Sequence, residues 1–246
     1  MGHATKNILE IKDLNKMFGG LAAVRNVTAD IKEGEILGMI GPNGAGKTTL
    51  FNLISGAYAP DSGSILFEGE HIEGKADYQI SQRGICRTYQ IVKPFNNLTV
   101  LENVLVGAFK KSGPMRLAKE FSLDLLNFIG LYEKRKHLAS SLTLAEKKSL
   151  EVARALATQP KLILLDEVMA GLNPKEQSDS IKLIFEMNQK GITLLVIEHK
   201  MKIIMSISNR IMVLHYGEKI AEGSPEEVSG HPKVIEAYLG EKDSLA

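Results

Sequence analysis

The chain of 246 residues has a single cysteine, Cys86, and it lacks long apolar runs. One cysteine excludes an intramolecular disulfide and favours a reducing compartment. The longest apolar runs, within 161–166 and 192–197, end after five or six residues, whereas a membrane-spanning helix needs about twenty. Residues 1–7 also lack the apolar core of a signal peptide. We therefore expect the isolated chain to be soluble and cytosolic, and to reach a membrane only through a partner.

An excess of charge of one sign is also missing, because 30 Lys and Arg residues stand against 29 Asp and Glu residues. The resulting net charge of +1 gives no whole-molecule attraction to nucleic acid or anionic lipid. Low-complexity segments, repeats and Pro/Ser-rich linkers are absent as well. With 44% apolar and 24% charged residues, the composition is that of a soluble globular protein. This composition excludes a disordered chain, a fibrous one and a coiled-coil rod.

The apolar pattern predicts alternating strands and helices. Strands are expected over 8–14, 27–31, 35–40, 64–72, 161–166, 192–198 and 209–215, and helices over 47–55, 76–82, 174–190 and 234–239. Continuous apolar strands that alternate with helices favour an α/β fold with a mainly parallel sheet. The early strands favour an antiparallel addition to this sheet. Helical periodicity over 98–158 favours an inserted helical subdomain that divides the core.

A phosphate-binding loop is predicted between an expected strand and an expected helix. Gly41, Gly46, Lys47 and Thr48 match the pattern G-x-x-x-x-G-K-[ST]. Glycines let several backbone N–H groups converge on one anion and let phosphate approach, and the following helix points its positive end at the same place. Lys47 is expected to reach the β- and γ-phosphates, and Thr48 to bind Mg²⁺. The nucleotide-binding residues predicted here are Gly41, Pro42, Asn43, Gly44, Ala45, Gly46, Lys47, Thr48 and Thr49.

Two carboxylates, Asp166 and Glu167, stand at the end of the apolar strand expected over 161–166. An unpaired carboxylate is costly to bury, so the pair beside a phosphate loop is interpreted as functional. Asp166 is expected to hold Mg²⁺ through its water shell. Because adjacent strand residues face opposite sides, Glu167 shares the site only if the strand has already turned. Glu167 then accepts a proton from, or orients, the water that attacks the γ-phosphate.

The ordered set of motifs resembles the ATP-binding subunits of ABC transporters over essentially the whole chain. The resemblance implies that Phe18 stacks on adenine, that Gln90 contacts the metal and the attacking water, and that His199 contacts the γ-phosphate. The family's signature precedes the helix 147–157, and its D-loop corresponds to 170–173. Within the family, the resemblance is strongest to ATPase subunits for branched-chain amino acids, and urea-type subunits are closely similar. The stretches that carry it are 95–103, 170–174, 197–199 and 234–240.

This resemblance implies a single ABC ATPase domain over 1–246. A P-loop NTPase core would occupy 1–97 and 159–246, and the helical subdomain with the signature would occupy 98–158. The implied cofactors are ATP and Mg²⁺, the implied catalytic residues are Lys47, Gln90, Glu167 and His199, and the implied metal-binding residues are Thr48, Gln90 and Asp166. The implied partners are a second ATPase subunit, identical or related, transmembrane permease subunits and, indirectly, a periplasmic solute-binding protein, but no nucleic acid. The expected place is peripheral, on the cytoplasmic face of the inner membrane.

The signature departs from the family's usual Leu-Ser-Gly-Gly-Gln and reads Leu-Thr-Leu-Ala-Glu at 142–146. In the family this loop closes over the γ-phosphate held by the other subunit, so that two subunits sandwich two ATP molecules. The residues implied to act in this way are Thr143, Leu144, Ala145 and Glu146. Leu144 brings a bulky side chain to a position normally without one. Thr143 and Glu146 also match a capping box, which uses the same N–H groups as an anion would. We therefore hypothesise that Glu146 makes closure weaker than glutamine does.

Smaller departures are Val168, where proline often follows the glutamate, and Asn173, which replaces the aspartate of the D-loop. Lys147 and Lys148 are interpreted as a solvated helix face.

Other functions stay open. The altered signature is compatible with a subunit that binds ATP but hardly hydrolyses it. The set of Gln90, Glu167 and His199 disfavours a small-molecule kinase, and the lack of duplicated cassettes or long coiled coils disfavours a soluble ATPase acting on ribosomes or DNA.

Overall fold

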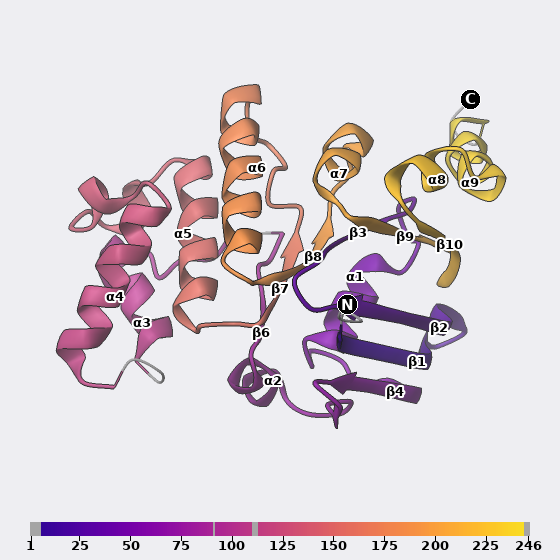
Figure 1. Ribbon diagram of the computed structural model, residues 1–246, viewed down its shortest axis with the longest axis horizontal. Coiled ribbons are helices and arrows are strands. Elements are labelled where there is room, and N and C mark those ends of the chain that lie inside the picture. Colours follow the sequence, from indigo (N-terminus) through magenta and orange to yellow (C-terminus); the bar gives the residue numbers. More distant parts are fainter. Residues whose placement is uncertain (1–5, 91, 110–112, 244–246) are drawn as a thin grey trace, which may run out of the picture.

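A computed structural model describes residues 6–90, 92–109 and 113–243 (Figure 1). The expectation that 1–7 contains no signal peptide falls mainly on residues outside these ranges. Across the described ranges, no helix is both long and apolar enough to cross a membrane. The chain folds into two sheets, with a group of helices at one end of the molecule (Figure 1).

The first sheet is antiparallel, in the order β2-β1-β4-β5. Its strands are β1 (Asn7–Phe18), β2 (Leu21–Lys32), β4 (Ser62–Phe67) and β5 (Glu70–His71). The single strand expected over 64–72 is wrong, because the chain reverses at Glu68 and Gly69, whose φ angles are 51° and 83°. Two consecutive residues with positive φ make a tight turn whose twist matches that of the flanking strands. Phe67 therefore pairs with Glu70 in a hairpin.

The second sheet has six strands in the order β10-β9-β3-β8-β7-β6. Its strands are β3 (Ile36–Ile40), β6 (Ile85–Arg87), β7 (Leu162–Asp166), β8 (Thr193–Ile197), β9 (Arg210–His215) and β10 (Glu218–Gly223). All their pairings are parallel except that of β10 with β9. Every residue of β3, β7 and β8 is buried, which confirms the mainly parallel sheet. The sequence pattern did not indicate β6, which is too short, or β10, which is charged and partly exposed.

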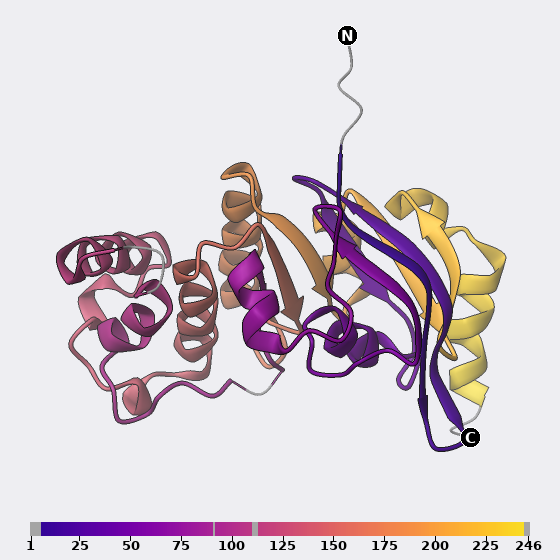
Figure 2. The same ribbon diagram turned by 90° about the horizontal axis from the view of Figure 1, so that it is seen from below.

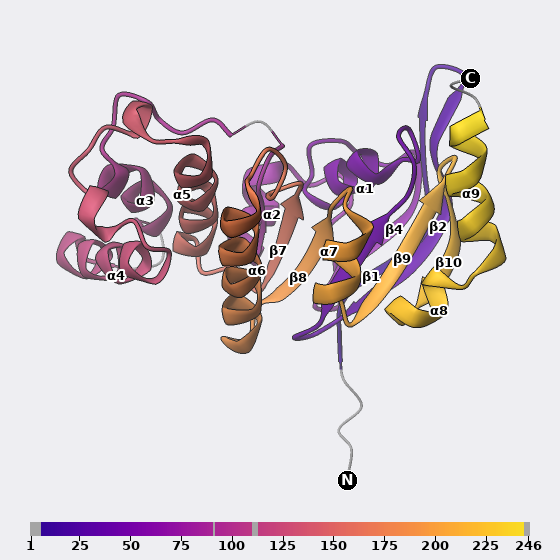
Figure 3. The same ribbon diagram turned by 90° about the horizontal axis from the view of Figure 1, so that it is seen from above.

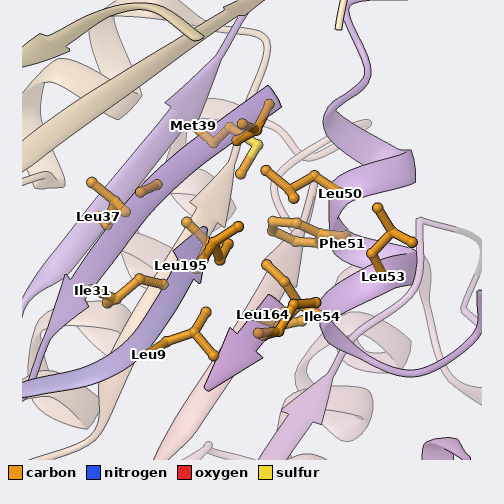
Figure 4. Close-up of a cluster of buried hydrophobic side chains, with 14 of the residues drawn as sticks. Leu9, Ile31, Leu37, Met39, Leu50, Phe51, Leu53, Ile54, Leu164 and Leu195 are labelled. Atoms are coloured by element: carbon orange, nitrogen blue, oxygen red, sulfur yellow. The ribbon is translucent and has the colours of Figure 1, made fainter. Parts of the chain in front are cut away.

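Helix α1 (Lys47–Ile54) directs its apolar side chains toward strands of both sheets (Figure 4). Its apolar side chains join one buried cluster with residues of both sheets, among them Leu9, Ile31, Leu37, Leu50, Phe51, Ile54, Leu164 and Leu195. The other face of the parallel sheet is covered by α6 (Pro174–Gln189), α7 (Met201–Ile207), α8 (Pro225–Ser229) and α9 (Pro232–Asp243) (Figure 3). Helix α2 (Asp77–Arg83) precedes β6. The phosphate loop is thereby fixed to a helix that both sheets hold in place.

The chain between β6 and β7 is helical, as the periodicity predicted. It contains α3 (Val100–Ala108), α4 (Met115–Phe128) and α5 (Leu144–Ala157), with 3₁₀ turns at Tyr132–Lys134 and Ala139–Ser141. These helices share a separate apolar cluster. Helix α5 belongs to both parts, since its Leu150 packs in that cluster and its Val152 packs against the parallel sheet. Figures 1 and 2 show α5 between the other two helices and α6.

Candidate active site

The phosphate loop connects β3 to α1, the context that the sequence pattern predicts. Gly41 and Gly46 have φ angles of 153° and 101°. A Cβ at Gly41 would lie 2.2 Å from the carbonyl oxygen of Leu214, and one at Gly46 would lie 2.3 Å from that of Ala23. These two glycines are therefore required because neighbouring backbone packs directly against the loop. Only the structure shows this reason, because Leu214 and Ala23 lie far from the loop in sequence.

Lys47 begins α1, and its side chain is buried across the loop. Its Nζ donates hydrogen bonds to the carbonyl oxygens of Gly41 and Pro42 at 2.6 and 2.8 Å. The ammonium is thus held at the loop, where the N-terminal end of α1 also contributes positive potential. Both features favour an anion at this place.

Asp166 ends β7 and forms a buried ion pair with Arg87 of β6. The Nη2 atom of Arg87 lies 2.8 Å from Oδ2 of Asp166, and the two side chains are 6% and 4% exposed. Asp166, Thr48 and Gln90 line one cavity of about 760 Å³. The structure therefore brings together the three residues predicted to bind the metal. The sequence pattern did not indicate Arg87, because its partner lies 79 positions away.

Glu167 follows β7 in a left-handed conformation, with a φ of 51°. The strand has thus turned at this residue, as sharing the site with Asp166 requires. Its Oε2 accepts a hydrogen bond from Nε2 of Gln90 at 2.9 Å, and its Oε1 lies 2.6 Å from Nε2 of His199. Three predicted catalytic residues from three segments of the chain therefore meet at one carboxylate. A non-glycine residue in this backbone conformation costs about 1–3 kcal/mol, so neighbouring contacts must hold the turn.

Most of the predicted nucleotide-binding residues line one cleft of about 720 Å³. The predicted residues that line it are Phe18, Asn43, Gly44, Ala45, Gly46, Lys47, Thr48, Thr49, Gln90, Glu167 and His199. Phe18 makes an edge-to-face contact with Tyr58, with ring centroids 5.3 Å apart. Tyr216 also lines the cleft and is 77% exposed. It was missed because a tyrosine after a strand carries no motif, and only the fold places the β9–β10 turn beside the loop.

The signature residues lie outside this cleft, at the start of α5. Thr143 and Glu146 form the predicted capping box: Thr143 Oγ1 accepts from the Glu146 N–H at 3.3 Å, and Glu146 Oε2 accepts from the Thr143 N–H at 3.0 Å. Leu144 is half exposed. Glu146 also pairs with Lys134, whose Nζ lies 2.5 Å from Oε1. Burial raises the pKa of Glu146, but Lys134 and the Thr143 N–H outweigh this and hold it below its ordinary value.

Substitution of Glu146 with glutamine tests the signature hypothesis. Glutamine keeps the cap, removes one negative charge and releases the ammonium of Lys134. We expect Glu146→Gln to tighten ATP-driven dimerisation about two- to fivefold, as a charge change at a helix N-terminus does. Sedimentation in a Glu167→Gln background measures the dissociation constant. Glu133→Gln, the same change at an exposed position, serves as the control. Unchanged or weaker association of Glu146→Gln would contradict the hypothesis.

The interpretation of Lys148 as solvated is wrong. Its side chain is 7% exposed, and Nζ donates to the carbonyl oxygens of Glu167 and Ala170 at 2.9 and 2.7 Å. The sequence pattern did not reveal this burial, because it does not show which lysine faces a neighbouring segment. The helical register turns Lys148 toward the 167–170 turn, while Lys147 stays partly exposed. A lysine pair in sequence does not reveal which member faces a neighbour.

Glu151, one turn further along α5, holds the segment that carries Gln90. Its Oε1 accepts a hydrogen bond from the backbone N–H of Tyr89 at 2.9 Å. Burial raises the pKa of Glu151 from its ordinary value of 4.5 to about 7, against the lowering effects of the Tyr89 N–H and Arg154.

This raised pKa predicts a pH-dependent stability. Between 4.5 and about 7 the folded protein keeps a proton on Glu151 that the unfolded chain has lost, so the free energy of unfolding falls as the pH rises. Glu151→Gln removes the titrating group and with it this pH dependence of the unfolding free energy. We expect the unfolding free energy of the variant, relative to the wild type, to rise by about 1–3 kcal/mol between about pH 5 and pH 8. Urea denaturation across this range measures it, and a difference independent of pH would contradict the prediction.

Comparison with known proteins identifies the family. The family described as ABC transporter matches residues 24–170, more than half of the chain. The chain belongs to the ABC transporter family. The family described as branched-chain amino acid ATP-binding cassette transporter matches residues 218–244 of this ABC ATPase. As a member of the family, the protein binds ATP and hydrolyses it to drive transport.

Individual relatives of the ABC ATPase cover almost its whole length. The high-affinity branched-chain amino acid transport ATP-binding protein LivG of Salmonella typhimurium is 44% identical over 95% of this chain and 98% of LivG. MJ1267, an ATP-binding cassette of an ABC transporter solved in its ADP conformation, is 33% identical, with a TM-score of 0.87 over 96% of this chain and 100% of that one. MJ0796, a bacterial ABC transporter cassette solved as a dimer, is 26% identical, with a TM-score of 0.79 over 88% and 98%.

Val168 and Asn173, the two smaller departures from the family pattern, both make structural contacts in the ABC ATPase. Val168 is buried in the apolar cluster on one face of the parallel sheet. Asn173 caps α6, since its Oδ1 accepts from the Glu176 N–H at 3.0 Å and its own N–H donates to Glu176 at 2.9 Å. An amide oxygen caps a helix as well as a carboxylate does.

Proposed function

We propose that this ABC ATPase is the nucleotide-hydrolysing subunit of an importer for branched-chain or related amino acids. The relative LivG, the match of the C-terminal segment and the full-length resemblance support this solute class. Urea and other solutes are the alternative cargo, because closely similar subunits serve them. The observation that carries the hydrolytic function is the Glu167 carboxylate, held by Gln90 and His199 at the cleft of the phosphate loop.

The proposed mechanism is an in-line attack of water on the γ-phosphate, in which the bond to the β–γ bridging oxygen breaks as the new P–O bond forms, and ADP leaves. Phe18 stacks on the adenine, and the loop N–H groups, Lys47 and the N-terminus of α1 bind the phosphates. Glu167 accepts the proton of the attacking water or orients that water. Gln90 and His199 hold the two oxygens of Glu167 in place; in this scheme Gln90 also contacts the metal and the attacking water, and His199 contacts the γ-phosphate. In this scheme Lys47 stabilises negative charge on the transferred phosphoryl group.

The residues that line the neighbouring cavity fit a magnesium ion. Thr48, Gln90 and Asp166 offer a hydroxyl, an amide oxygen and a carboxylate, which are the oxygen ligands that Mg²⁺ prefers. Thr48 and Gln90 would contact the ion, and Asp166 would hold it through its water shell. An ion held in this way would neutralise charge on the β- and γ-phosphates. Arg87, which lines the same cavity, pairs with the Asp166 carboxylate.

The position of the signature supports a second ATPase subunit as a partner. Thr143, Leu144, Ala145 and Glu146 lie outside the cleft of their own subunit, so they serve a nucleotide only across a dimer. We propose that two ATPase subunits, identical or related, sandwich two ATP molecules on the cytoplasmic face of the membrane. They drive permease subunits that receive solute from a periplasmic binding protein. The single domain of 1–246, with its helical part at 98–158, transmits closure to the permease.

Transport assays test this proposal. Proteoliposomes that contain the ATPase, its permease subunits and the solute-binding protein should take up labelled leucine only with ATP inside, while urea uptake stays at background. Phosphate release from the same preparation decides the second candidate, a subunit that binds ATP but hardly hydrolyses it. The bulky Leu144 favours that candidate, and the Glu167–His199 contact favours hydrolysis. Phosphate release that does not rise with transport would contradict the proposed function.

A further inference from the structure

One face of α5 contacts the catalytic segments of its own subunit. Leu144, Lys148 and Glu151 lie at positions i, i+4 and i+7 of the helix and so share one side. Leu144 lies against Gly171, where an added Cβ would be 3.1 Å from its Cδ2. Lys148 binds the turn that starts at Glu167, and Glu151 binds the backbone of Tyr89. The helix that begins with the signature therefore touches the D-loop, the catalytic turn and the Gln90 segment.

Lys148 bridges both ends of the catalytic turn. The turn is closed by a hydrogen bond of 3.1 Å from the backbone N–H of Ala170 to the backbone carbonyl oxygen of Glu167. The Nζ of Lys148 binds the carbonyl oxygens of these same two residues. On the other side of the turn, the Met169 N–H donates to Oε1 of Glu198, the residue before His199, at 2.9 Å. The left-handed conformation of Glu167 is thus held between a cation from α5 and a carboxylate after β8.

Simple packing does not explain an ammonium at this place. Burial lowers the pKa of Lys148, against the attraction of Glu198, Glu151 and Glu167, so the charged form carries a desolvation penalty. An apolar side chain would fill the same space without that penalty. What the ammonium adds is directional bonding to two carbonyl oxygens 22 and 19 positions away in sequence.

We propose that Lys148 is a positioning residue that ties the Glu167 turn to the signature helix of the same subunit. This inference rests on the proposed function, in which the start of α5 meets the nucleotide of the partner subunit. When that nucleotide draws the N-terminus of α5 inward, Lys148 carries the displacement to Glu167. Each signature then does more than close the partner's site, because it also adjusts the catalytic turn of its own site.

The test compares Lys148→Met with Lys148→Arg and with the matched control Lys147→Met. Lys148→Met should lower kcat about 10- to 100-fold, the effect of displacing a catalytic group by about 1 Å, and should leave KM and the affinity for trinitrophenyl-ATP within about threefold. Lys148→Arg, whose guanidinium also donates to two oxygens, should restore most of kcat. Lys147→Met should resemble the wild type. The Hill coefficient for ATP should fall toward 1 in Lys148→Met only.

Hydrogen exchange supplies a second readout that does not need turnover. The amides of 168–171 should exchange about tenfold faster in Lys148→Met than in the wild type, and those of α1 should not change. If Lys148→Met does not fold, Lys148→Gln, which is too short to bridge both carbonyl oxygens, replaces it. The inference is overturned if kcat and exchange stay at wild-type values. It is also overturned if kcat, nucleotide affinity and melting temperature fall together without rescue by arginine. Absence of ATPase activity in the wild-type protein would instead refute the proposed function. Hydrogen exchange of the amides of 168–171 would then still test whether Lys148 holds the turn.

Discussion

Replacement of Glu167 with glutamine lowers kcat for ATP hydrolysis about 10³-fold, within the range expected for loss of a general base. Glutamine has nearly the same shape, and its amide oxygen can still accept from Gln90 or His199, but it cannot take a proton from water. The phosphate loop is untouched, so the affinity for ATP stays within about threefold of the wild type. Steady-state phosphate release and binding of fluorescent ATP measure the two quantities separately.

The control for this prediction is Glu186→Gln, the same change at an exposed position of α6. It should retain wild-type turnover. Retained turnover in Glu167→Gln would remove Glu167 from the role of base. Loss of ATP binding in that variant would instead show that the glutamate shapes the phosphate site rather than acting on water.

Replacement of Arg87 with methionine destabilises the fold by about 3–5 kcal/mol, because it leaves the buried carboxylate of Asp166 without its ion-pair partner. The double variant Arg87→Met/Asp166→Asn removes the stranded charge and should recover about 1–3 kcal/mol of this loss. Urea denaturation in the absence of nucleotide measures all three free energies of unfolding. In the wild type the two side chains lie 2.8 Å apart and are almost completely enclosed.

A matched control separates burial from charge. Arg116 pairs with Glu120 four residues later on the exposed surface of α4. Arg116→Met should change the free energy of unfolding by less than about 1 kcal/mol, because a solvated ion pair contributes little. Equal losses of unfolding free energy in Arg87→Met and in the double variant would contradict the prediction. They would show that the loss does not come from the Asp166 carboxylate left without its partner.

The parts of the site that could be predicted from sequence are those whose chemistry is local. Glycine, lysine and threonine in fixed spacing between a strand and a helix predict a phosphate loop without reference to any distant residue. A carboxylate pair after an apolar strand similarly defines the strand end. The β4–β5 hairpin was missed for a related reason, because Glu68 provides no turn signal as strong as Asn or Asp would before Gly69.

The parts that could not be predicted depend on pairs that lie far apart in the chain. In the sequence, Arg87 is an ordinary charged residue, and its role becomes visible only because β6 pairs with β7. Tyr216 lies near the phosphate loop only because the fold places the β9–β10 turn there. Lys148 is the sharpest case, since its neighbour Lys147 has the same chemistry and a different environment. Helical register and packing distinguish the two, and composition does not.

Short-range spacing is enough to predict the phosphate loop and the carboxylate pair at the end of a strand, because each motif is built from residues that are neighbours in sequence. How these motifs are held in place becomes visible only in the folded chain. The ion pair at Asp166, the bridged turn at Glu167 and the close approach of backbone to Gly41 all join segments that are distant in sequence. Their energies come from burial and from hydrogen-bond direction, which exist only after the chain has folded.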